Sequence, residues 1–185
     1  MKKNGIIVKI CLIGDASVGK TSIRRRYNGD YFKDNYLATI GADFSIKKLT
    51  IGDRTIKMQI WDLAGQDYYK ANRKAYYINV NGLILVYDLS RLNTFDNLPN
   101  WLNELKDIIK ENKKSKQSKI PIVITGNKID LQPPISQDQL NDTIEKLSEE
   151  FEDNFVFNHI YTSAKTGENI NKAFEILVDN ILKVM

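Results

Sequence analysis

The sequence predicts an α/β domain with a six-stranded, mostly parallel sheet, one antiparallel strand and helices on both faces. Short apolar, β-branched runs alternate with longer amphipathic segments, a pattern typical of parallel strands joined by helices. Two segments of alternating polarity meet at Gly52–Asp53, which is typical of a hairpin, so one strand should run antiparallel. No repeat or linker-like stretch divides the 185 residues, and we expect a single domain over residues 1–185.

Six apolar runs have the length and composition of strands. They are Ile6–Ile13, Asp43–Ile51, Thr55–Asp62, Gly82–Asp88, Ile120–Gly126 and Phe155–Tyr161. Five segments between them have helical periodicity. They are Lys20–Tyr27, a stretch around Tyr68–Ile78, Phe95–Glu111, Gln137–Glu150 and Asn169–Val184. Ser136 and Gln139 have the spacing of a capping box, which predicts the start of the fourth helix.

The composition is that of an ordinary globular protein. Hydrophobic residues make up 42% and charged residues 27%, and the net charge of +4 is explained by a solvated surface, so we expect no nucleic-acid binding. The single cysteine, Cys11, lies in an apolar run and cannot form a disulfide within the chain. The only histidine is His159, which excludes sites that need two histidines.

The first strand runs into the glycine-rich segment GDASVGKT, residues 14–21, which fits G-x-x-x-x-G-K-[ST]. Successive backbone N–H groups of such a loop point into one concavity at a helix N-terminus, as a polyphosphate requires. We expect Lys20 to supply a cation to the terminal phosphates and Thr21 to ligate Mg²⁺. The predicted phosphate-binding residues are Ala16, Ser17, Val18, Gly19, Lys20, Thr21 and Ser22.

The third strand ends in WDLAGQ, residues 61–66. Asp62 stands where a carboxylate linked to Mg²⁺ through a water is needed, and Gly65 allows its N–H to approach a γ-phosphate. Gln66 can orient a water for in-line attack. The D-x-x-G pattern alone is equally typical of a turn at a strand end, and its order among the other motifs favours the functional interpretation.

The fifth strand ends in GNKID, residues 126–130, and this segment selects the base. A carboxylate at Asp130 can accept the N1–H and N2–H₂ donors of guanine, whereas adenine presents a lone pair there. An unpaired buried acceptor costs about 1–3 kcal/mol, so the segment favours guanine. Asn127 can bind the other edge of the purine, and the stem of Lys128 can cover its flat face.

A weaker match follows the sixth strand, where TSAKTG spans residues 162–167. The Ala164 N–H could donate to O6 of guanine, and its neighbours Ser163 and Lys165 would complete the base site. On its own this segment is also typical of an ordinary strand-to-helix loop, and its position one strand–helix unit after NKID is what gives it weight.

The five motifs in this order, from Gly14 to Lys165, resemble a small GTPase of the Ras superfamily. The stretches TIGADFSIK, WDLAGQDYY and AYY are most similar to the Rab type. The resemblance implies one GTPase domain that binds GTP or GDP with Mg²⁺ as cofactor. It implies slow GTP hydrolysis with Gln66 and Lys20 as catalytic residues, in a switch that regulates trafficking or signalling.

The resemblance also implies further ligand contacts. Phe32 would pack against guanine, Tyr36 would cover the phosphates, and Thr39 would be a second Mg²⁺ ligand. The segments Asn28–Gly41 and Gly65–Ile78 would be the two switches, ordered by the γ-phosphate and released on hydrolysis. These segments would bind effectors, exchange factors and GTPase-activating proteins.

Three aromatic positions match a surface trio that binds effectors in Rab-like proteins. They are Phe44, Trp61 and Tyr76, and packing within the fold would explain each of them equally well. Rab-like proteins normally end in prenylated cysteines, which are absent here, and no glycine follows Met1 for myristoylation. We expect a cytoplasmic monomer without a lipid anchor in this chain, which reaches membranes only through partners or through a missing tail.

Two alternatives to a GTP-driven switch stay open. One is a GTP-bound interaction module without turnover: Gln66 and Thr39 argue against it, but Ala16, where Ras proper has glycine, leaves room for it. The other is a P-loop ATPase, against which Asp130 argues. The first switch has Lys33 as its only cation and no arginine. We therefore expect slow intrinsic hydrolysis, on the order of 10⁻⁴–10⁻³ s⁻¹.

Overall fold

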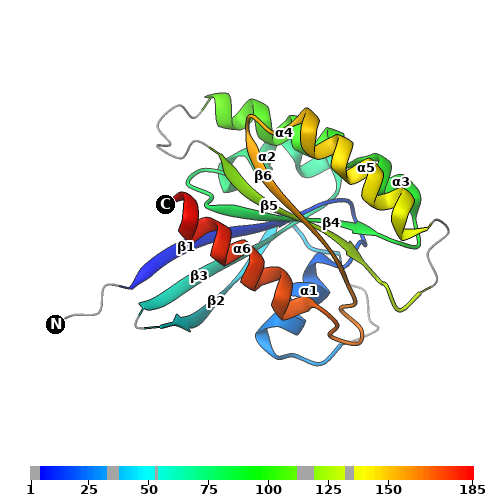
Figure 1. The fold of residues 1–185 in the computed structure, drawn as a ribbon. Helices are drawn as coiled ribbons and strands as arrows, with labels where there is room; N and C mark the ends of the chain where they lie inside the picture. Colours follow the sequence, from blue (N-terminus) through cyan, green and yellow to red (C-terminus); the bar gives the residue numbers. More distant parts are fainter. Residues whose placement is uncertain (1–4, 33–37, 53, 112–118, 132–135) are drawn as a thin grey trace.

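A computed structural model describes residues 5–32, 38–52, 54–111, 119–131 and 136–185. One six-stranded sheet, in the order β2-β3-β1-β4-β5-β6, forms the middle layer, and helices cover both of its faces (Figure 1). The strands are β1 Ile6–Ile13, β2 Ala42–Ile51, β3 Arg54–Leu63, β4 Gly82–Asp88, β5 Ile120–Asn127 and β6 Phe155–Thr162. Only β2 and β3 pair antiparallel among these strands, which confirms the predicted fold class.

The helices follow the predicted order with one difference. They are α1 Lys20–Asn28, α2 Lys70–Tyr76, α3 Leu92–Asp96, α4 Leu98–Glu111, α5 Gln137–Glu150 and α6 Ile170–Val184, with a 3₁₀ turn, η1, at Asp67–Tyr69. The prediction of one helix over Phe95–Glu111 is wrong, because helical structure is interrupted at Asn97, between the end of α3 and the start of α4. Pro99 is the cause, since proline lacks an N–H and is tolerated only in the first turn of a helix.

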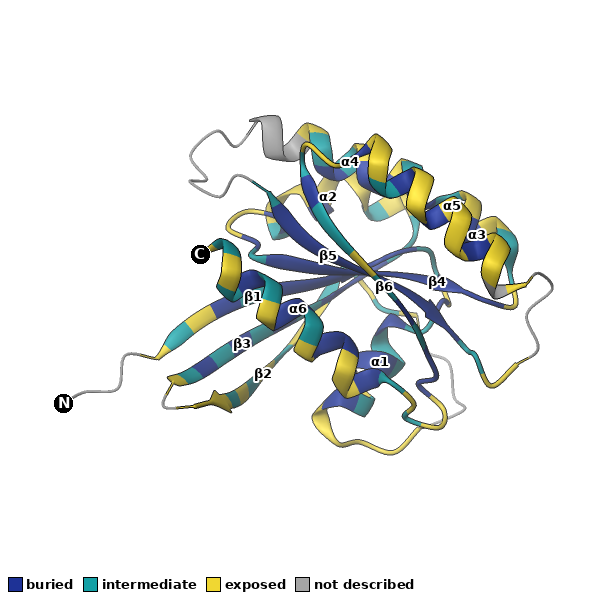
Figure 2. Ribbon diagram, in the orientation of Figure 1, coloured by how far each residue is buried: buried dark blue, intermediate teal, exposed yellow. Residues whose placement is uncertain are grey.

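Each face of the sheet carries its own apolar core. α1 and α6 cover one face, while α2, α4 and α5 cover the other. The central strands β4 and β5 are buried along their whole length, whereas the edge strand β2 is not (Figure 2). The predicted apolar face of α6 is fully buried; it consists of Ile170, Ala173, Phe174, Leu177, Val178 and Ile181. Burying a side chain such as Phe174 contributes about 1.5–3 kcal/mol.

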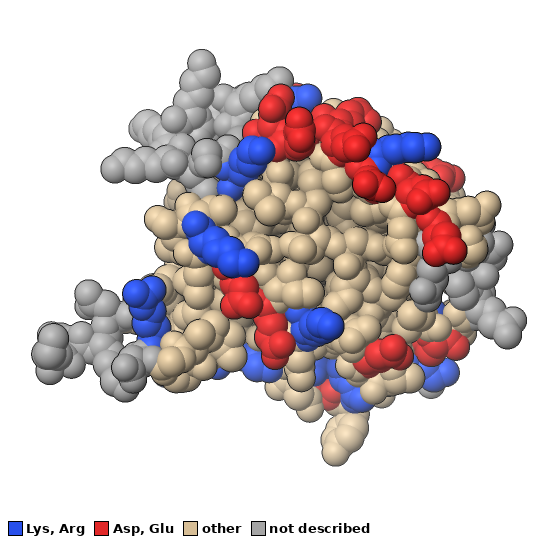
Figure 3. All heavy atoms as spheres, viewed as in Figure 1, with Lys and Arg blue, Asp and Glu red and all other residues tan. Residues whose placement is uncertain are grey.

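The capping box at the start of α5 is present as predicted. Ser136 Oγ accepts the Gln139 N–H, and the Gln139 side chain accepts the Ser136 N–H. The exposed side of α5 is strongly acidic, and red side chains gather over it in Figure 3. Among the helices described, none combines the length and apolar character that crossing a bilayer requires.

The strand order places the carboxyl end of β1 at the middle of one sheet edge. The chain leaves β1 towards β3 on one side and later returns to β4 on the other. Ligands of open α/β sheets bind beyond the carboxyl ends of the strands at such a reversal. The segments that follow β1, β3, β5 and β6 are therefore brought together at one edge.

Candidate functional site

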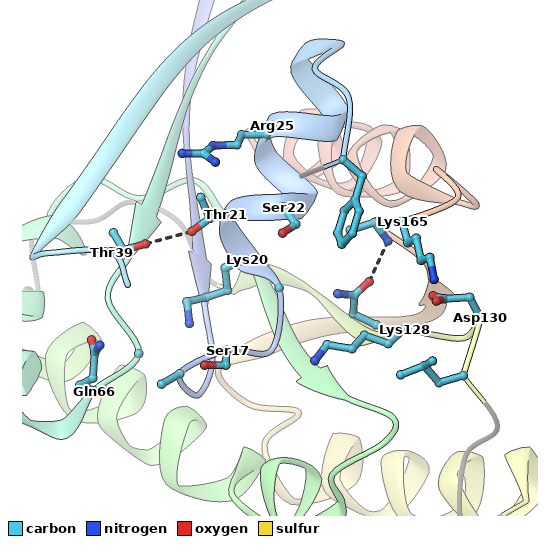
Figure 4. A pocket seen from close by; sticks show the side chains of 17 residues that line it. Ser17, Lys20, Thr21, Ser22, Arg25, Thr39, Gln66, Lys128, Asp130 and Lys165 are labelled. Carbon is cyan, nitrogen blue, oxygen red and sulfur yellow. Dashed lines mark hydrogen bonds between the residues drawn. The ribbon is translucent and has the colours of Figure 1, made fainter. Parts of the chain in front are cut away.

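A cavity of about 330 Å³ lies at this edge, within the size range of small-molecule sites (Figure 4). It is lined by Ala16, Ser17, Gly19, Lys20, Thr21, Ser22, Arg25, Phe32, Thr39, Gly65, Gln66, Asn127, Lys128, Asp130, Leu131, Ala164 and Lys165. Most of the predicted site residues are thus brought together, although they are spread over the whole chain. Tyr36 lies outside the described residues.

Three predicted residues lie behind the lining. The Val18 side chain is fully buried in the core, and only its carbonyl is used, as the acceptor for Asn127. Asp62 is also fully buried and contacts the lining residue Thr21. Ser163 is buried too, and its hydroxyl donates to Asp130. These residues support the groups that face the cavity.

The glycine-rich loop wraps the ammonium group of Lys20. Lys20 is 6% exposed, and its Nζ donates to the carbonyls of Gly14 (2.7 Å) and Asp15 (2.6 Å). Gly14 and Gly19 have φ angles of 128° and 103°, which L side chains rarely adopt, so this path requires glycine. Burial lowers the pKa of Lys20 to about 8, opposed by Asp62 and Asp15, so the amine still carries its charge near pH 7.

Oxygen atoms that could ligate a metal lie close together beside this loop. Thr21 Oγ1 donates to Asp62 Oδ2 at 2.5 Å and lies 2.9 Å from Thr39 Oγ1. The second carboxylate oxygen of Asp62, Oδ1, is buried and has no hydrogen-bond partner among the described residues. Burial raises the pKa of Asp62, opposed by the Thr21 hydroxyl and Lys20. Two hydroxyls and an unsatisfied carboxylate oxygen fit Mg²⁺, which takes few protein ligands and keeps its remaining positions for water and phosphate.

The base side of the cavity is built around Asn127. Its Nδ2 donates to the Val18 carbonyl at 2.9 Å, which ties β5 to the phosphate loop. Its Oδ1 accepts from Thr162 Oγ1 (3.2 Å) and from the Ala164 N–H (3.1 Å), which ties β5 to the segment after β6. The buried Asn127 side chain, 1% exposed, thus connects β5, the phosphate loop and the segment after β6 through these hydrogen bonds. Asp130, by contrast, lies on the lining and accepts from Ser163 Oγ at 2.6 Å.

Asp88, at the end of β4, was not predicted as part of the site. It is fully buried and accepts from Lys128 Nζ (2.6 Å), Arg91 Nε (2.9 Å) and the Ser90 hydroxyl (2.6 Å). Burial alone would raise its pKa, but these hydrogen bonds hold the pKa of Asp88 below its ordinary value. Lys128, which has a φ of 72°, is thereby held across the base side of the cavity.

Arg91 and Arg25 are two further residues that the sequence motifs did not indicate. Arg91 Nη2 donates to the carbonyl of Ala16 at 2.9 Å and so supports the phosphate loop from outside. Arg25 lines the cavity one helical turn after Thr21. The i, i+4 spacing on α1 was a usable signal for Arg25. Arg91 had none, because its contact with the phosphate loop, through the Ala16 carbonyl, spans 75 residues of the chain.

The segment after β3 lies directly against the phosphate loop. A Cβ on Gly65 would meet the Gly14 carbonyl oxygen at 2.5 Å and the Ala16 nitrogen at 2.6 Å, so only glycine fits there. The next residue, Gln66, also lines the cavity, and within the part of the chain that the structure describes its buried Oε1 has no hydrogen-bond partner. That oxygen is free to accept a hydrogen bond from a water inside the cavity.

The three aromatic residues contact one another outside the cavity. The Phe44 and Trp61 rings stack with centroids 5.0 Å apart, and the Trp61 and Tyr76 centroids are 5.5 Å apart. Trp61 and Tyr76 pack against the core, so packing explains part of their role. Phe44 is 53% exposed, which leaves this aromatic surface open to solvent at one end.

A strand, a glycine-rich loop and a helix that enclose a buried lysine are the structure of a P-loop nucleotide-binding protein. The Ras family model matches residues 9–183. The chain is 34% identical to Ras-related protein Rab7 of Drosophila melanogaster over 178 residues, which cover 96% of this chain and 82% of that protein. It is 37% identical to Ras-related protein Rab-13 of Mesocricetus auratus (95% and 80% covered) and 38% identical to RABA4a of Arabidopsis thaliana (100% and 76%). The chain therefore belongs to the Ras family and is a Rab-like small GTPase.

Proposed function

We propose that this protein is a single-domain guanine-nucleotide switch that binds GTP or GDP with Mg²⁺, hydrolyses GTP slowly and regulates membrane trafficking through effectors. The observation that carries the proposal is a single cavity with two different ends. At one end a loop of amides surrounds Lys20, and at the other Asp130 offers a carboxylate held by Ser163. The first end suits a triphosphate and the second suits the donor edge of guanine.

Hydrolysis is assigned to groups around the γ-phosphate position. Gln66 holds the attacking water through its free Oε1, while Lys20 and the Gly65 N–H bind the phosphate oxygens on which charge develops. Thr21, Thr39 and, through a water, Asp62 would hold Mg²⁺, which neutralises phosphate charge when bound. The protein's part in the reaction is therefore positioning and electrostatic stabilisation.

Intrinsic turnover should be slow because the first switch, Asn28–Gly41, contains no arginine that could stabilise charge on the γ-phosphate. Arg91 is engaged with Asp88 and with the Ala16 carbonyl. We expect a rate on the order of 10⁻⁴–10⁻³ s⁻¹, which an external activator raises by about 10³–10⁵-fold. Single-turnover hydrolysis by the purified chain measures this rate, and a value near 1 s⁻¹ without a partner would refute it.

Partners are assigned to the surfaces beside the γ-phosphate position. The segments Asn28–Gly41 and Gly65–Ile78 would bind effectors, exchange factors and GTPase-activating proteins, and the exposed face of Phe44 extends this surface. The described part of Asn28–Gly41 includes Thr39, which is already in contact with Thr21. We propose a monomer that acts in the cytoplasm, meets membranes peripherally and does not bind nucleic acid.

The deciding experiment compares the wild-type chain with Gln66→Leu. The variant should hydrolyse bound GTP at least tenfold more slowly and retain its affinity for GDP, because Gln66 acts on the water and not on the diphosphate. Excess ATP should fail to displace labelled GTP from either protein. Equal rates in the two proteins would favour an interaction module without turnover, and displacement by ATP would favour an ATPase.

A further inference from the structure

Arg73, on α2, is buried to 2% exposure, which is rare for an arginine unless it is paired. Its guanidinium forms a two-pronged ion pair with Glu104 of α4, with Nε–Oε1 and Nη2–Oε2 distances of 3.0 Å. The Tyr77 hydroxyl donates to the same carboxylate at 3.3 Å. The charges of both partners are thus satisfied inside the protein, and the pair fixes α2 against α4.

The remaining prong of the guanidinium contacts the switch backbone. Nη1 donates to the carbonyls of Ala64 (3.2 Å) and Gln66 (2.9 Å), the two residues on either side of Gly65. The guanidinium also lies over the Trp101 ring, 4.4 Å from its centroid. These contacts hold Arg73 in one place and in one orientation.

Trp101 connects this assembly to the phosphate loop. Its indole Nε1 donates to Asp15 Oδ1 at 2.7 Å, and Asn97 Nδ2 donates to the same oxygen at 2.6 Å. The Gly65 segment therefore lies between the phosphate loop and the Arg73 side chain. The phosphate loop blocks it on one side, where a Cβ would meet Gly14 and Ala16, and Arg73 holds its carbonyls on the other.

The hydrogen bond from Arg73 to the Ala64 carbonyl also fixes the direction of the Gly65 N–H, because both groups belong to one peptide plane. In a planar trans peptide the C=O and the following N–H point in opposite directions, and no cis peptide occurs among the described residues. Because the Ala64 carbonyl points to Arg73, the Gly65 N–H points away from Arg73. Gly65 itself lines the cavity, so this N–H is available to a ligand there.

We propose that Arg73 is a positioning residue for GTP hydrolysis: it orients the Gly65 N–H towards the γ-phosphate and holds the backbone from which Gln66 reaches the water. This inference rests on the proposed function. The planar fork of arginine can serve two carbonyls and a carboxylate at once, whereas the point charge of lysine cannot. Arg73 should therefore affect the triphosphate state and leave GDP binding nearly unchanged.

A purely structural role for the ion pair would give a different result. Replacing both partners of a buried pair by apolar residues of similar size often leaves stability unchanged or improves it. The double variant Arg73→Met/Glu104→Leu should therefore fold, while it removes both hydrogen bonds to the switch carbonyls. The single variant Arg73→Lys keeps the charge and removes the fork, which provides a second, independent test if the double variant is unstable.

The experiment measures three quantities for each variant: the melting temperature, the single-turnover rate of GTP hydrolysis, and the ratio of the dissociation constants of GDP and an imido analogue of GTP. We expect both variants to hydrolyse GTP at least tenfold more slowly and to lose about tenfold in their relative affinity for the analogue, with GDP affinity changed less than about threefold. Arg54→Met and Asp107→Asn, which alter exposed charges on β3 and α4, are the matched controls and should behave as wild type.

The outcomes separate this inference from the proposed function. A folded double variant with the wild-type rate and the wild-type affinity ratio would overturn the role of Arg73. Equal losses of GDP and analogue binding would also overturn it, because they would show a structural effect alone. If the wild-type chain binds the analogue without hydrolysing GTP, the proposed turnover fails while the affinity ratio still decides on Arg73. A wild-type chain that binds no guanine nucleotide would overturn both.

Discussion

Asp130 Oδ1 and Ser163 Oγ lie 2.6 Å apart, although 33 residues separate them in the chain. The Ser163 hydroxyl donates its single hydrogen bond to Asp130, and its oxygen accepts a hydrogen bond from the Thr166 N–H at 3.0 Å. The carboxylate is thereby oriented by a loop that follows a different strand. Because Asp130 lines the cavity, this carboxylate is presented to a ligand there, and this arrangement leads to the first prediction.

Asp130→Asn should exchange guanine specificity for xanthine specificity. An asparagine can accept the N1–H of either base, but it donates to the C2 substituent, which is an amine in guanine and a carbonyl in xanthine. Losing charge-assisted hydrogen bonds should weaken GTP binding by about 10²–10³-fold. Competition between labelled GDP and xanthosine triphosphate checks this, and unchanged GTP affinity in the variant would show that Asp130 does not contact the base.

Removing Mg²⁺ should speed nucleotide release, and this effect should depend on Thr21, which is a proposed ligand of the ion. Chelation by EDTA should raise the GDP release rate of the wild-type chain at least tenfold, because the phosphate charge is then balanced only by Lys20 and the amides. Thr21→Ala should release GDP quickly even with excess Mg²⁺ and respond little to EDTA. Thr50→Ala, an exposed threonine on β2, serves as the control. A release rate independent of EDTA in the wild-type chain contradicts the site.

Gly65→Ala should impair the triphosphate state selectively. The added Cβ would meet backbone atoms of Gly14 and Ala16, which cannot rotate away, so the switch backbone must move off the phosphate loop. We expect hydrolysis to fall by 10²-fold or more, since about 1 Å of misplacement has that effect, with GDP affinity changed little. Gly5→Ala is the control, because its Cβ would make only an ordinary contact with the Thr55 carbonyl. Normal hydrolysis by Gly65→Ala would disprove the close approach.

His159 should make the protein less stable in acid. Its Nε2 lies 3.1 Å from the Tyr87 hydroxyl, its ring packs against Tyr161, and burial lowers its pKa from 6.5 to about 4. Between these two pKa values the unfolded chain binds a proton that the native chain does not, so the free energy of unfolding falls as the pH falls through this window. Going from about pH 7 to about pH 4.5 should remove roughly 2 kcal/mol through this group.

Urea unfolding of wild type and His159→Gln at both pH values measures this contribution. Glutamine can still bond to the Tyr87 hydroxyl but does not titrate, so the variant should lose less stability on acidification by about 2 kcal/mol. Parallel losses in the two proteins would assign the acid sensitivity to other groups.

Local sequence was a good guide wherever one segment decides its own structure. The strand Ile6–Ile13 and the helix Gln137–Glu150 have the predicted bounds, because an apolar run and a capping box act over neighbouring residues. The helix over Phe95–Glu111 failed for an equally local reason. Pro99 signals a first helical turn, and treating it as part of a continuous helix overlooked the break at Asn97.

Sequence motifs indicated the candidate site residues that now line one cavity, but they did not indicate the residues that support them. Lys20, Gln66 and Asp130 were identified because each stands at a fixed spacing after a strand, and the structure places all three on one cavity. Asp88 and Arg91 stand in no such motif, and the contacts that link them to the site, with Lys128 and with the Ala16 carbonyl, span 40 and 75 residues.

The sequence by itself determined the order of the strands, the glycine-rich loop after β1 and the candidate carboxylate for a purine, Asp130, because these depend on composition and spacing within short segments. Only the tertiary structure decided that Arg73 is buried. Between the exposed cations Lys70 and Lys74 on α2, an arginine has the appearance of a surface residue. Its burial follows from the packing of α2 on α4, where Glu104, 31 residues further along the chain, compensates its charge. Long-range compensation of a buried charge has no local signal, since each partner alone is as compatible with water as with the core.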